Sequence, residues 1–436
     1  HKLLIFTRIS FGSGFLEVIL LENFGSFLNL KEFNMFKKIL STAITTLVLS
    51  GLMISPAAMA DTIKLGAAVS LSGKYSTAGN HTKKGYDLGV KYVNSRGGVL
   101  VDGKTYMLEI VYYDDESTPA RGASLAERLI LRDGVSFMLG PYSSGLTKAI
   151  APVTELHGVP MVEANGASRS LFNQGYRYMF AVLSTSEQYL QEAVNQIAIK
   201  AGKPASEITV ALAIENDPFS QDIRAGVLDD VKRHGMTVVI DDKLPRDLSD
   251  MTSTLVKVKA LKPDLLVVSG HSKGAALSVR QMKDLGVSVN MLAMTHCESA
   301  KLDDKEKFGN LADYALCAAQ WSPSVSSEGT LFGTAGNYSA IFNKEYGYVP
   351  PYQAAESTAA VQVMADAITR ANSLDKDAVR DALAATDLST FYGQIRFSEA
   401  GNNIAKPMIL RQLIDGKYYV VAPANVAEAE LVYPRP

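Results

Sequence analysis

The sequence predicts an α/β protein made of two similar units, each with a parallel sheet that helices cover on both faces. Three observations lead to this prediction. Apolar strands alternate with amphipathic helices from residue 61 onward, the scheme runs through the chain twice, and no low-complexity linker separates the two runs. Strands continuously rich in Val, Ile and Leu are typical of parallel sheets buried on both faces. Two such units without a flexible tether indicate two lobes joined by short crossings, with a ligand cleft between them.

The first unit is expected to contain five strands and three helices. Each strand is an apolar run that ends at polar or glycine residues, and the strands are expected at residues 63–70, 106–116, 137–140, 159–164 and 178–184. The helices have apolar residues at helical spacing, and Pro119 and Gly134 mark the two ends of the second helix. These helices are expected at residues 77–94, 119–134 and 146–158.

The second unit repeats this alternation before the pattern changes. Its strands are expected at residues 208–217, 236–242, 264–270, 290–296 and 314–321, and its helices at residues 187–202, 219–235, 252–263 and 273–286. A long helical stretch follows at 334–387, interrupted by Pro350-Pro351. Residues 393–398 and 408–423 are expected as strands, the latter folded into a hairpin around Asp415-Gly416.

Composition narrows the classes of function. The chain has 436 residues, of which 47% are hydrophobic and 20% charged, as is ordinary for a soluble α/β protein. A formal net charge of −2 offers no electrostatic case for nucleic-acid binding. Cys297 and Cys317 are too few for a disulfide framework and match no zinc spacing. Whether these two cysteines form a single bridge is left open by the sequence.

A secretory signal peptide is predicted at residues 35–60. Lys37-Lys38 form a positive start, residues 39–54 an apolar stretch, and residues 58–60 a small-x-small cleavage site. A membrane anchor is the alternative, but the apolar part is short for a span. We therefore expect export, cleavage before Asp61 and a periplasmic location for the mature protein.

Residues 1–34 precede this signal peptide, although such a signal belongs at the start of a chain. Lys31-Glu32 can be encoded by AAGGAG, a ribosome-binding sequence, just ahead of Met35. We therefore expect translation to start at Met35 and residues 1–34 to be upstream DNA read through in frame. A longer natural leader is the alternative.

Signatures of catalysis and of metal binding are missing from the sequence. There is no G-x-G-x-x-G after a strand, no G-x-x-x-x-G-K-[ST] and no H-E-x-x-H. Ser143 and Ser144 lack the G-x-S-x-G elbow and an indicated His or Asp partner. His296, Cys297 and Glu298 are adjacent, but neighbours at a strand end point in different directions. We expect no enzyme, no cofactor and no metal.

The remaining candidate is a binding site at the ends of strands. In open α/β sheets, ligands bind beyond the carboxyl ends of the strands, where helix N-termini offer N–H groups. Such ends lie at residues 71–79, 140–145 and 163–168 in the first unit and at residues 215–222, 269–274 and 295–299 in the second. Each one alone is an ordinary turn with a capping residue. Together, on two facing units, they describe a pocket.

Several segments resemble one known family. The quoted runs "IKLGAAVSLSGKYSTAG", "VNSRGG", "YDDESTPARGASLAERLI" and "LGPYSSGLTKAIAPVTELHGVPMV" are similar to type I periplasmic substrate-binding proteins of branched-chain amino-acid ABC transporters. The resemblance extends in order over residues 61–436. It implies two Rossmann-like lobes that close around a small molecule, joined by a three-crossing hinge near residues 181–184, 321–324 and 391–394. Lobe 1 would comprise residues 61–182 with 323–391, and lobe 2 residues 183–322 with 392–436.

The resemblance also assigns ligand contacts, position by position. It implies that a serine and the backbone of the next strand-end loop hold a ligand carboxylate, and that an aromatic residue of the second lobe packs on the ligand. The matching residues are Ser144, Asn165, Gly166, Ala167 and Phe219. From the residues themselves, we expect Ser143 to cap the following helix and Ser144 to grip an anion.

Two departures from the family pattern bear on whether the ligand is an α-amino acid. The family's amine-binding acid lies in the loop after the strand "DLLVVSG", and here that loop reads "HSKGAA", without an acid. The aromatic residue expected late in the first loop is replaced by Ala78, with Tyr75 nearby. Glu298 or Glu163 can substitute for the missing acid. Alternatively, His271 suits a carboxylate with an aromatic or apolar body and no amine.

We therefore expect a soluble, monomeric periplasmic protein that binds a small carboxylate, such as a branched-chain or other hydrophobic amino acid. The resemblance implies delivery of this ligand to the membrane permease of an ABC importer. An aromatic acid or an amide is the alternative ligand. A ligand-sensing receptor module is the alternative function, since type I lobes also serve there. A third alternative is an exported hydrolase with Ser144 as its nucleophile, but the sequence indicates no general base to activate this serine.

Overall fold

The computed structural model describes residues 4–11, 14–21 and 61–436. The first two segments are strands β1 (Leu4–Phe11) and β2 (Gly14–Leu21), which pair antiparallel. Residues 60–436 form a separate compact unit. The predicted signal peptide at residues 35–60 lies outside the described residues, so its cleavage before Asp61 stays a prediction, as does the upstream origin of residues 1–34.

The first lobe is built on a six-stranded sheet with the strand order β4-β5-β3-β6-β7-β8. Five strands run parallel, and β4 pairs antiparallel with β5. The strands are β3 (Asp61–Val69), β4 (Val99–Val101), β5 (Lys104–Asp114), β6 (Phe137–Leu139), β7 (Met161–Glu163) and β8 (Met179–Ala181). The short strand β4 is not predicted from the sequence, because three residues carry too little periodicity.

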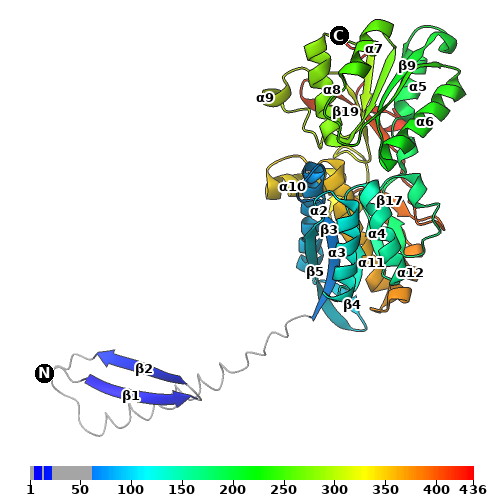
Figure 1. The fold of residues 1–436 in the computed structure, drawn as a ribbon. Helices are drawn as coiled ribbons and strands as arrows, with labels where there is room; N and C mark the ends of the chain where they lie inside the picture. Colours follow the sequence, from blue (N-terminus) through cyan, green and yellow to red (C-terminus); the bar gives the residue numbers. More distant parts are fainter. Residues whose placement is uncertain (1–3, 12–13, 22–60) are drawn as a thin grey trace. The chain divides into compact units, whose positions relative to one another are not determined.

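Helices from two distant parts of the chain cover this sheet (Figure 1). They are α2 (Ser76–Ser95), α3 (Pro119–Leu131), α4 (Ser144–Leu156), α10 (Ala335–Tyr346), α11 (Tyr352–Ala371) and α12 (Lys376–Ala384). Helix α11 lies directly against α2, where the Thr358 hydroxyl donates to the Gly85 carbonyl at 2.7 Å. A Cβ atom at Gly85 would lie 2.2 Å from the Ala354 carbonyl oxygen, so this approach requires glycine.

The second lobe is built on a seven-stranded sheet with the order β10-β9-β11-β12-β13-β18-β19. The first five strands are parallel and the last two antiparallel. They are β9 (Thr209–Glu215), β10 (Thr237–Leu244), β11 (Leu265–Ser269), β12 (Met291–Met294), β13 (Leu316–Ala319), β18 (Ile409–Ile414) and β19 (Lys417–Ala422). Its helices are α5 (Gln191–Lys200), α6 (Pro218–His234), α7 (Thr252–Leu261), α8 (His271–Leu285) and α9 (Lys305–Phe308).

Strand β11 shows why these strands read as continuous apolar runs. Leu265 and Val267 belong to one apolar core, whereas Leu266 and Val268 belong to another on the opposite face of the sheet. All four side chains are buried. A strand buried on both faces has no polar face to alternate with, so the predicted α/β class is confirmed.

The chain passes between the two sheets three times: after β8, after β13 and after β17 (Gly393–Arg396). The helical stretch predicted at 334–387 is α10, α11 and α12 followed by β16 (Asp387–Thr390), which pairs with β17. Asn372, at a φ of 46°, ends α11. The smaller elements are β14 (Glu328–Gly329), β15 (Gly333–Thr334), η1 (Arg169–Leu171), η2 (Ser186–Gln188), η3 (Ala205–Glu207) and η4 (Ala424–Val426). None of the described helices combines the length and apolar character that a membrane span needs.

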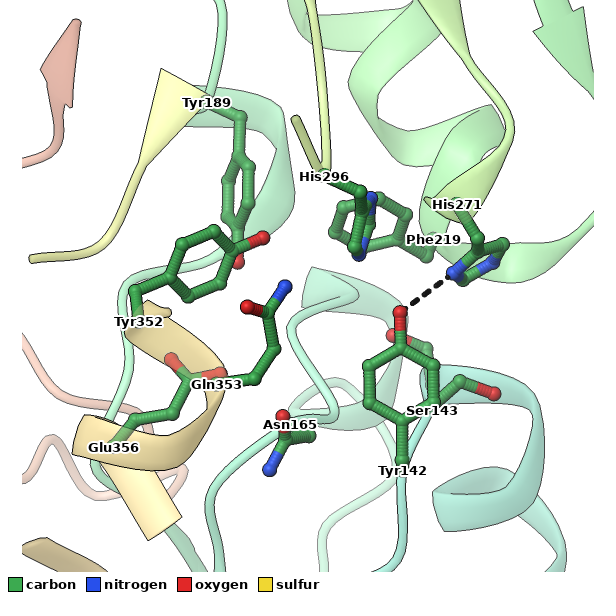
Figure 2. A pocket seen from close by; sticks show the side chains of 11 residues that line it. Tyr142, Ser143, Asn165, Tyr189, Phe219, His271, His296, Tyr352, Gln353 and Glu356 are labelled. Carbon is green, nitrogen blue, oxygen red and sulfur yellow. Dashed lines mark hydrogen bonds between the residues drawn. The ribbon is translucent and has the colours of Figure 1, made fainter. Parts of the chain in front are cut away.

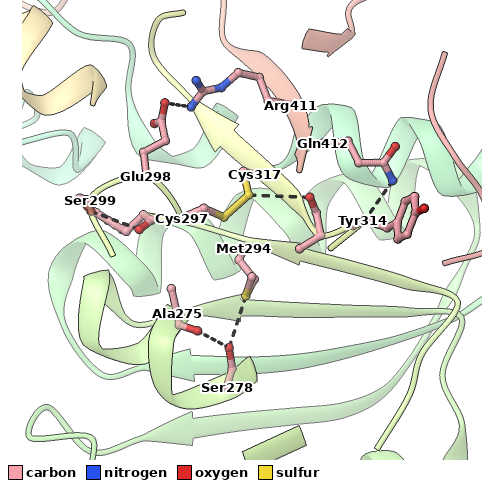
Figure 3. Close-up of a disulfide and its surroundings, with 12 residues drawn as sticks. Ala275, Ser278, Met294, Cys297, Glu298, Ser299, Tyr314, Cys317, Arg411 and Gln412 are labelled. Carbon is pink, nitrogen blue, oxygen red and sulfur yellow. Dashed lines mark hydrogen bonds and ion pairs between the residues drawn. A yellow bond between two sulfur atoms is a disulfide. The ribbon is translucent and has the colours of Figure 1, made fainter. Parts of the chain in front are cut away.

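The two cysteines form a disulfide, which settles the question that the sequence left open (Figure 3). Cys297 follows β12 and Cys317 lies in β13, with their Cα atoms 5.9 Å apart and a sequence separation of 20. Both residues are buried in the apolar core of the second lobe. The bond therefore attaches the loop after β12 to the neighbouring strand.

Candidate functional site

A pocket lies between the two lobes, at a place where four of the described helices begin (Figure 2). Helices α4 and α11 contribute from the first lobe, and α6 and α8 from the second. The lining residues are Tyr142, Ser143, Ser144, Asn165, Tyr189, Phe219, His271, His296, Tyr352, Gln353 and Glu356. The space between the lining residues is about 240 Å³, and this volume includes solvent at the open side of the pocket.

The start of α4 presents groups that suit an anion. The N–H groups of Leu146 and Thr147 donate to the Ser143 carbonyl oxygen, at 3.0 and 2.9 Å. The Ser143 hydroxyl is buried and has no hydrogen-bond partner. The prediction that this hydroxyl caps α4 is therefore wrong, because it accepts no hydrogen bond from the first-turn N–H groups. The hydroxyl is left for the pocket, beside a helix N-terminus that favours negative charge.

Ser144 is the first residue of α4 and connects this helix to the next strand-end loop. Its hydroxyl oxygen accepts a hydrogen bond from the Ser168 N–H at 3.0 Å. A hydroxyl also carries one proton to donate. Ser144 therefore retains a donor for the pocket that it lines, although its oxygen already supports the loop.

Glu163 organises that loop and does not line the pocket. Its carboxylate accepts from the N–H groups of Asn165 and Gly166, at 2.6 and 2.7 Å, and from the Thr147 hydroxyl at 2.9 Å. Burial raises the pKa of Glu163 to about 7, although these hydrogen bonds oppose the shift. Of the loop residues predicted to bind ligand, Asn165 lines the pocket, whereas Gly166 and Ala167 do not.

Ring side chains form the walls of the pocket. Phe219 lies 5.1 Å from His296 and 5.4 Å from His271, measured between ring centroids. Phe219 also meets Tyr189 edge to face at 5.2 Å. Burial and the neighbouring His271 hold the pKa of His296 well below its ordinary value. Because no aliphatic Leu, Ile or Val lines the pocket, flat apolar faces dominate its walls.

His271 joins the two lobes at one end of the pocket. Its Nδ1 lies 3.0 Å from the Tyr142 hydroxyl of the first lobe, and its Nε2 lies 3.3 Å from a carboxylate oxygen of Asp217. Burial opposes ionisation of Asp217, but attraction to His271 and hydrogen bonds to His271 and Ser220 lower its pKa to about 2. Asp217 is therefore a permanent anion on the second lobe. Tyr75 lies 4.9 Å from the His271 ring and 5.6 Å from the Tyr142 ring, outside the lining residues.

Glu215, Asp217 and His271 form the one cluster among the described residues with three donor atoms close enough to hold a metal ion, all within 4.8 Å of one another. Lys74, from the loop after β3, makes an ion pair with Glu215 and also donates to the Arg246 carbonyl. The protein's own cationic side chain thus already contacts this acidic pair. This contact also links the two lobes.

Three lining residues come from the start of α11, a segment that the sequence analysis does not single out. Tyr352, Gln353 and Glu356 lie across the pocket from Ser143 and His271 in Figure 2. All three are buried. The sequence contains one signal for this segment: Gln353 and Glu356 are polar residues in an alanine-rich helix that follows Pro350-Pro351. The rule that ligands bind at strand ends does not predict this site, because α11 follows no strand of the six-stranded sheet.

Glu298, a predicted substitute for the missing amine-binding acid, lies beside the disulfide rather than in the pocket lining (Figure 3). It forms a buried ion pair with Arg411 on β18. Burial raises the pKa of Glu298, and the charge of Arg411 opposes that shift. The carboxylate is thus engaged with a cation of its own lobe.

Comparison with known proteins agrees with this architecture. Residues 62–417 match the periplasmic binding protein family. Leu/Ile/Val-binding protein homolog 8 of Brucella abortus (strain 2308) is 24% identical over 386 residues, which cover 86% of this chain and 94% of the relative.

Two solved structures share the fold. The leucine binding protein LivK of Thermotoga maritima MSB8 matches with a TM-score of 0.73 and 20% identity, covering 83% of this chain and 98% of that chain. A solute binding protein of an ABC transporter from Rhodopseudomonas palustris BisB5, in complex with 3,4-dihydroxybenzoic acid, matches with a TM-score of 0.72 and 20% identity, covering 86% and 99%. With two lobes, an interlobe pocket and a match across nearly all of residues 61–436, the chain belongs to the periplasmic binding protein family, whose members are solute-binding proteins and not enzymes.

Proposed function

We propose that this chain is the periplasmic solute-binding component of an ABC importer, and that it binds a small carboxylate with an aromatic or other flat apolar body. The ligand would lie in the interlobe pocket and be delivered to a membrane permease. The family and the predicted signal peptide support this location and role. We expect the carrier to act as a monomer, without cofactor or metal.

One observation carries the proposal: buried polar atoms without a hydrogen-bond partner converge on the pocket from both lobes. They are Ser143 Oγ, Asn165 Oδ1, His296 Nδ1, the Tyr352 hydroxyl and both amide atoms of Gln353. Buried polar atoms in folded proteins are nearly always hydrogen-bonded. A polar ligand held between ring side chains would satisfy these atoms.

A carboxylate suits the α4 end of the pocket. The Ser143 hydroxyl and the N–H groups of Ser144 and Gly145 at the start of α4 can donate to it, and the helix N-terminus favours its charge. No Lys or Arg lines the pocket, so hydrogen bonds rather than an ion pair would hold the anion. Charge-assisted hydrogen bonds of this kind are stronger than neutral ones.

A hydrophobic amino acid is the second candidate ligand. One observation favours it: Glu356 is an acid within the pocket and could meet an α-amine. The name of the Leu/Ile/Val-binding relative supports the same ligand class. Glu356 would then replace the acid missing from "HSKGAA", in place of Glu298 or Glu163, which the sequence offers for this role.

Closure about the three-crossing hinge would bury the ligand between lobe 1 (predicted as 61–182 with 323–391) and lobe 2 (predicted as 183–322 with 392–436). Crossings are predicted at 181–184, 321–324 and 391–394, but the third crossing follows β17, because β17 still pairs with β16. Three side-chain contacts support a closed arrangement. They are the ion pair of Lys74 with Glu215, the contact of Tyr142 with His271, and the 2.7 Å ion pair of Arg169 with Asp222.

Calorimetric titration tests the proposal with benzoate, phenylacetate, leucine and the uncharged analogue benzamide. We expect benzoate or phenylacetate to bind and benzamide to bind far more weakly. Ser143→Ala should weaken carboxylate binding by about 1.5–3 kcal/mol, the usual contribution of a hydrogen bond to a charged group. Ser95→Ala, which changes an exposed serine on α2, is the matched control. Equal affinity for benzamide and benzoate would refute the carboxylate assignment.

A further inference from the structure

We propose that the start of α11 forms a second recognition point, which binds an uncharged hydrogen-bonding substituent, a hydroxyl or a carboxamide, at the end of the ligand opposite its carboxylate. This inference rests on the proposed function and adds the chemical class of the ligand's other end. Substituted aromatic carboxylates, rather than plain hydrocarbon acids or amines, would be the preferred cargo.

The groups of this recognition point face the pocket from successive positions of one helix. Tyr352 and Gln353 are the first two residues of α11, and Glu356 lies one turn further along. Figure 2 shows these three side chains on one side of the pocket and Ser143 with His271 on the other. A ligand that places its carboxylate at Ser143 therefore directs its far end toward α11.

Gln353 and Tyr352 have unused hydrogen-bonding capacity in a buried place. Gln353 is 1% exposed, and neither its amide nitrogen nor its amide oxygen has a partner. The Tyr352 hydroxyl is also buried without a partner. Buried groups of this kind are costly unless something bonds to them, and a hydrocarbon substituent would leave all three atoms unsatisfied.

The pattern of donors and acceptors indicates what the partner must offer. The Gln353 amide presents a donor and an acceptor, and the Tyr352 hydroxyl can act as either. A ligand hydroxyl or carboxamide both donates and accepts, so it can bond to the two side chains together. A methyl group or a hydrogen can do neither.

Charge balance around Glu356 disfavours an ammonium group at this position. The Tyr392 hydroxyl donates to a Glu356 oxygen at 3.1 Å, and Lys406 is buried nearby. Burial raises the pKa of Glu356 well above its ordinary value and lowers that of Lys406 to about 7, each partner opposing the other's shift. With one proton between them the pair is neutral, and with two it is positive, so in neither state does it offset a ligand cation.

The recognition point is held in place by its surroundings. The Ser357 hydroxyl donates to the Gln353 carbonyl oxygen at 2.6 Å and accepts from the Asn165 amide at 3.0 Å. Thr358 bonds to α2, as described above. Helix α11 is thus attached both to the loop after β7, which contains Asn165, and to the core of its lobe. Rigid elements therefore hold the recognition point in place.

Titration calorimetry on the full chain with matched benzoates tests the inference. The ligands are benzoate, 3- and 4-hydroxybenzoate, 4-carbamoylbenzoate, 3- and 4-methylbenzoate and 4-(aminomethyl)benzoate. We expect the better hydroxybenzoate or the carbamoyl compound to bind at least tenfold more tightly than its methyl counterpart, and the ammonium compound to bind most weakly. Gln353→Leu should reduce the tenfold preference to less than threefold.

Tyr352→Phe removes one oxygen atom, is less disruptive, and should reduce the preference partially. Gln174→Leu and Tyr106→Phe, which lie outside the pocket, should leave the preference unchanged. Equal binding of methyl and hydroxyl compounds to the wild type, or tightest binding of the ammonium compound, overturns the inference while the proposed carboxylate carrier stands. Failure of every benzoate, with or without leucine binding, overturns the proposed aromatic ligand and this inference together.

Discussion

Helices α4 and α6 begin at the same pocket, and each follows a polar residue, yet these two residues have opposite roles. The Asp217 carboxylate accepts from the N–H groups of Phe219 and Ser220, at 3.0 and 3.2 Å, and so satisfies the start of α6. The Ser143 hydroxyl bonds to nothing at the start of α4. In the second lobe, the Asp217 carboxylate thus occupies the N-terminus of α6. In the first lobe, no side chain caps the N-terminus of α4.

This difference supports the proposal that a pocket lined by neither Lys nor Arg selects a carboxylate. An ionised Asp217 repels a second anion at α6, and the contact with His271 already uses its charge. The neutral hydroxyl of Ser143 adds a donor to the α4 terminus without adding negative charge. The same local signal, a polar residue before a helix, therefore caps the helix in one lobe and, under the proposed function, binds the ligand in the other.

Asp217→Ala should have the largest effect on stability, because Asp217 is the residue that stabilises the start of α6. The substitution removes the α6 cap and leaves His271 without its carboxylate partner. We expect the free energy of unfolding to fall by about 3–5 kcal/mol, the cost of breaking a buried pair. Urea unfolding measures this change. Asp217→Asn keeps a good cap and should lose less, and a loss below about 1 kcal/mol for Asp217→Ala would show that Asp217 does not support α6.

The double substitution Cys297→Ala with Cys317→Ala should have the second-largest effect. The disulfide attaches the loop after β12 to β13, and this loop carries His296. A bridge that closes a loop of this length is worth about 3 kcal/mol of unfolding free energy. Ligand affinity should also fall, since His296 lines the second-lobe wall. Chemical unfolding and calorimetry on oxidised and variant protein measure both. An unchanged affinity would separate the disulfide from the site.

Glu163→Gln tests the role of the carboxylate that holds the loop after β7 and bonds to Thr147 of α4. The native pKa of about 7 exceeds the ordinary 4.5, so the folded protein binds more protons than the unfolded chain between these values, and this carboxylate costs stability as pH rises from 4.5 to 7. The variant lacks the titration. We expect it to gain on the order of 2–3 kcal/mol relative to wild type across that window. A constant difference at pH 4.5, 6 and 7.5 in urea unfolding would contradict the shifted pKa.

Ser143→Ala should have the smallest effect on stability, although it weakens binding. A true cap residue costs about 0.5–2 kcal/mol when changed to alanine, whereas this hydroxyl caps nothing. We therefore expect the free energy of unfolding without ligand to change by less than about 0.5 kcal/mol. A loss of about 1–2 kcal/mol in the free energy of unfolding would show that the Ser143 hydroxyl does cap α4, and Ser143 would then not differ from Asp217 in this respect.

Much of the site could be predicted from the sequence, because parallel strands end at one edge of their sheet. Ser143, Ser144, Asn165, Phe219 and His271 all follow such strand ends, and all line the pocket. Gly166, Ala167 and Tyr75 follow the same rule but do not line the pocket, since the rule places a segment and not a side chain. Their part in binding stays a prediction.

The contacts that depend on distant segments could not be predicted. Asn165 bonds to Ser357, which is 192 residues further along the chain, and Glu298 finds Arg411 on another strand. The start of α11 reaches the pocket only because the helix packs on α2 of the same lobe. Spacing along the chain contains no information on such neighbours.

By itself the sequence determined the alternation of strands and helices, and hence the two-lobe α/β class, since hydrophobic periodicity is a local property. It also determined which strand-end segments meet at the cleft. Only the tertiary structure decided which polar atoms remain without partners: the Ser143 hydroxyl rather than that of Ser144, and the Gln353 amide rather than the Glu298 carboxylate. The physical reason is that hydrogen bonding is a competition among groups brought together in space, and burial removes the water that would otherwise satisfy the losing atom.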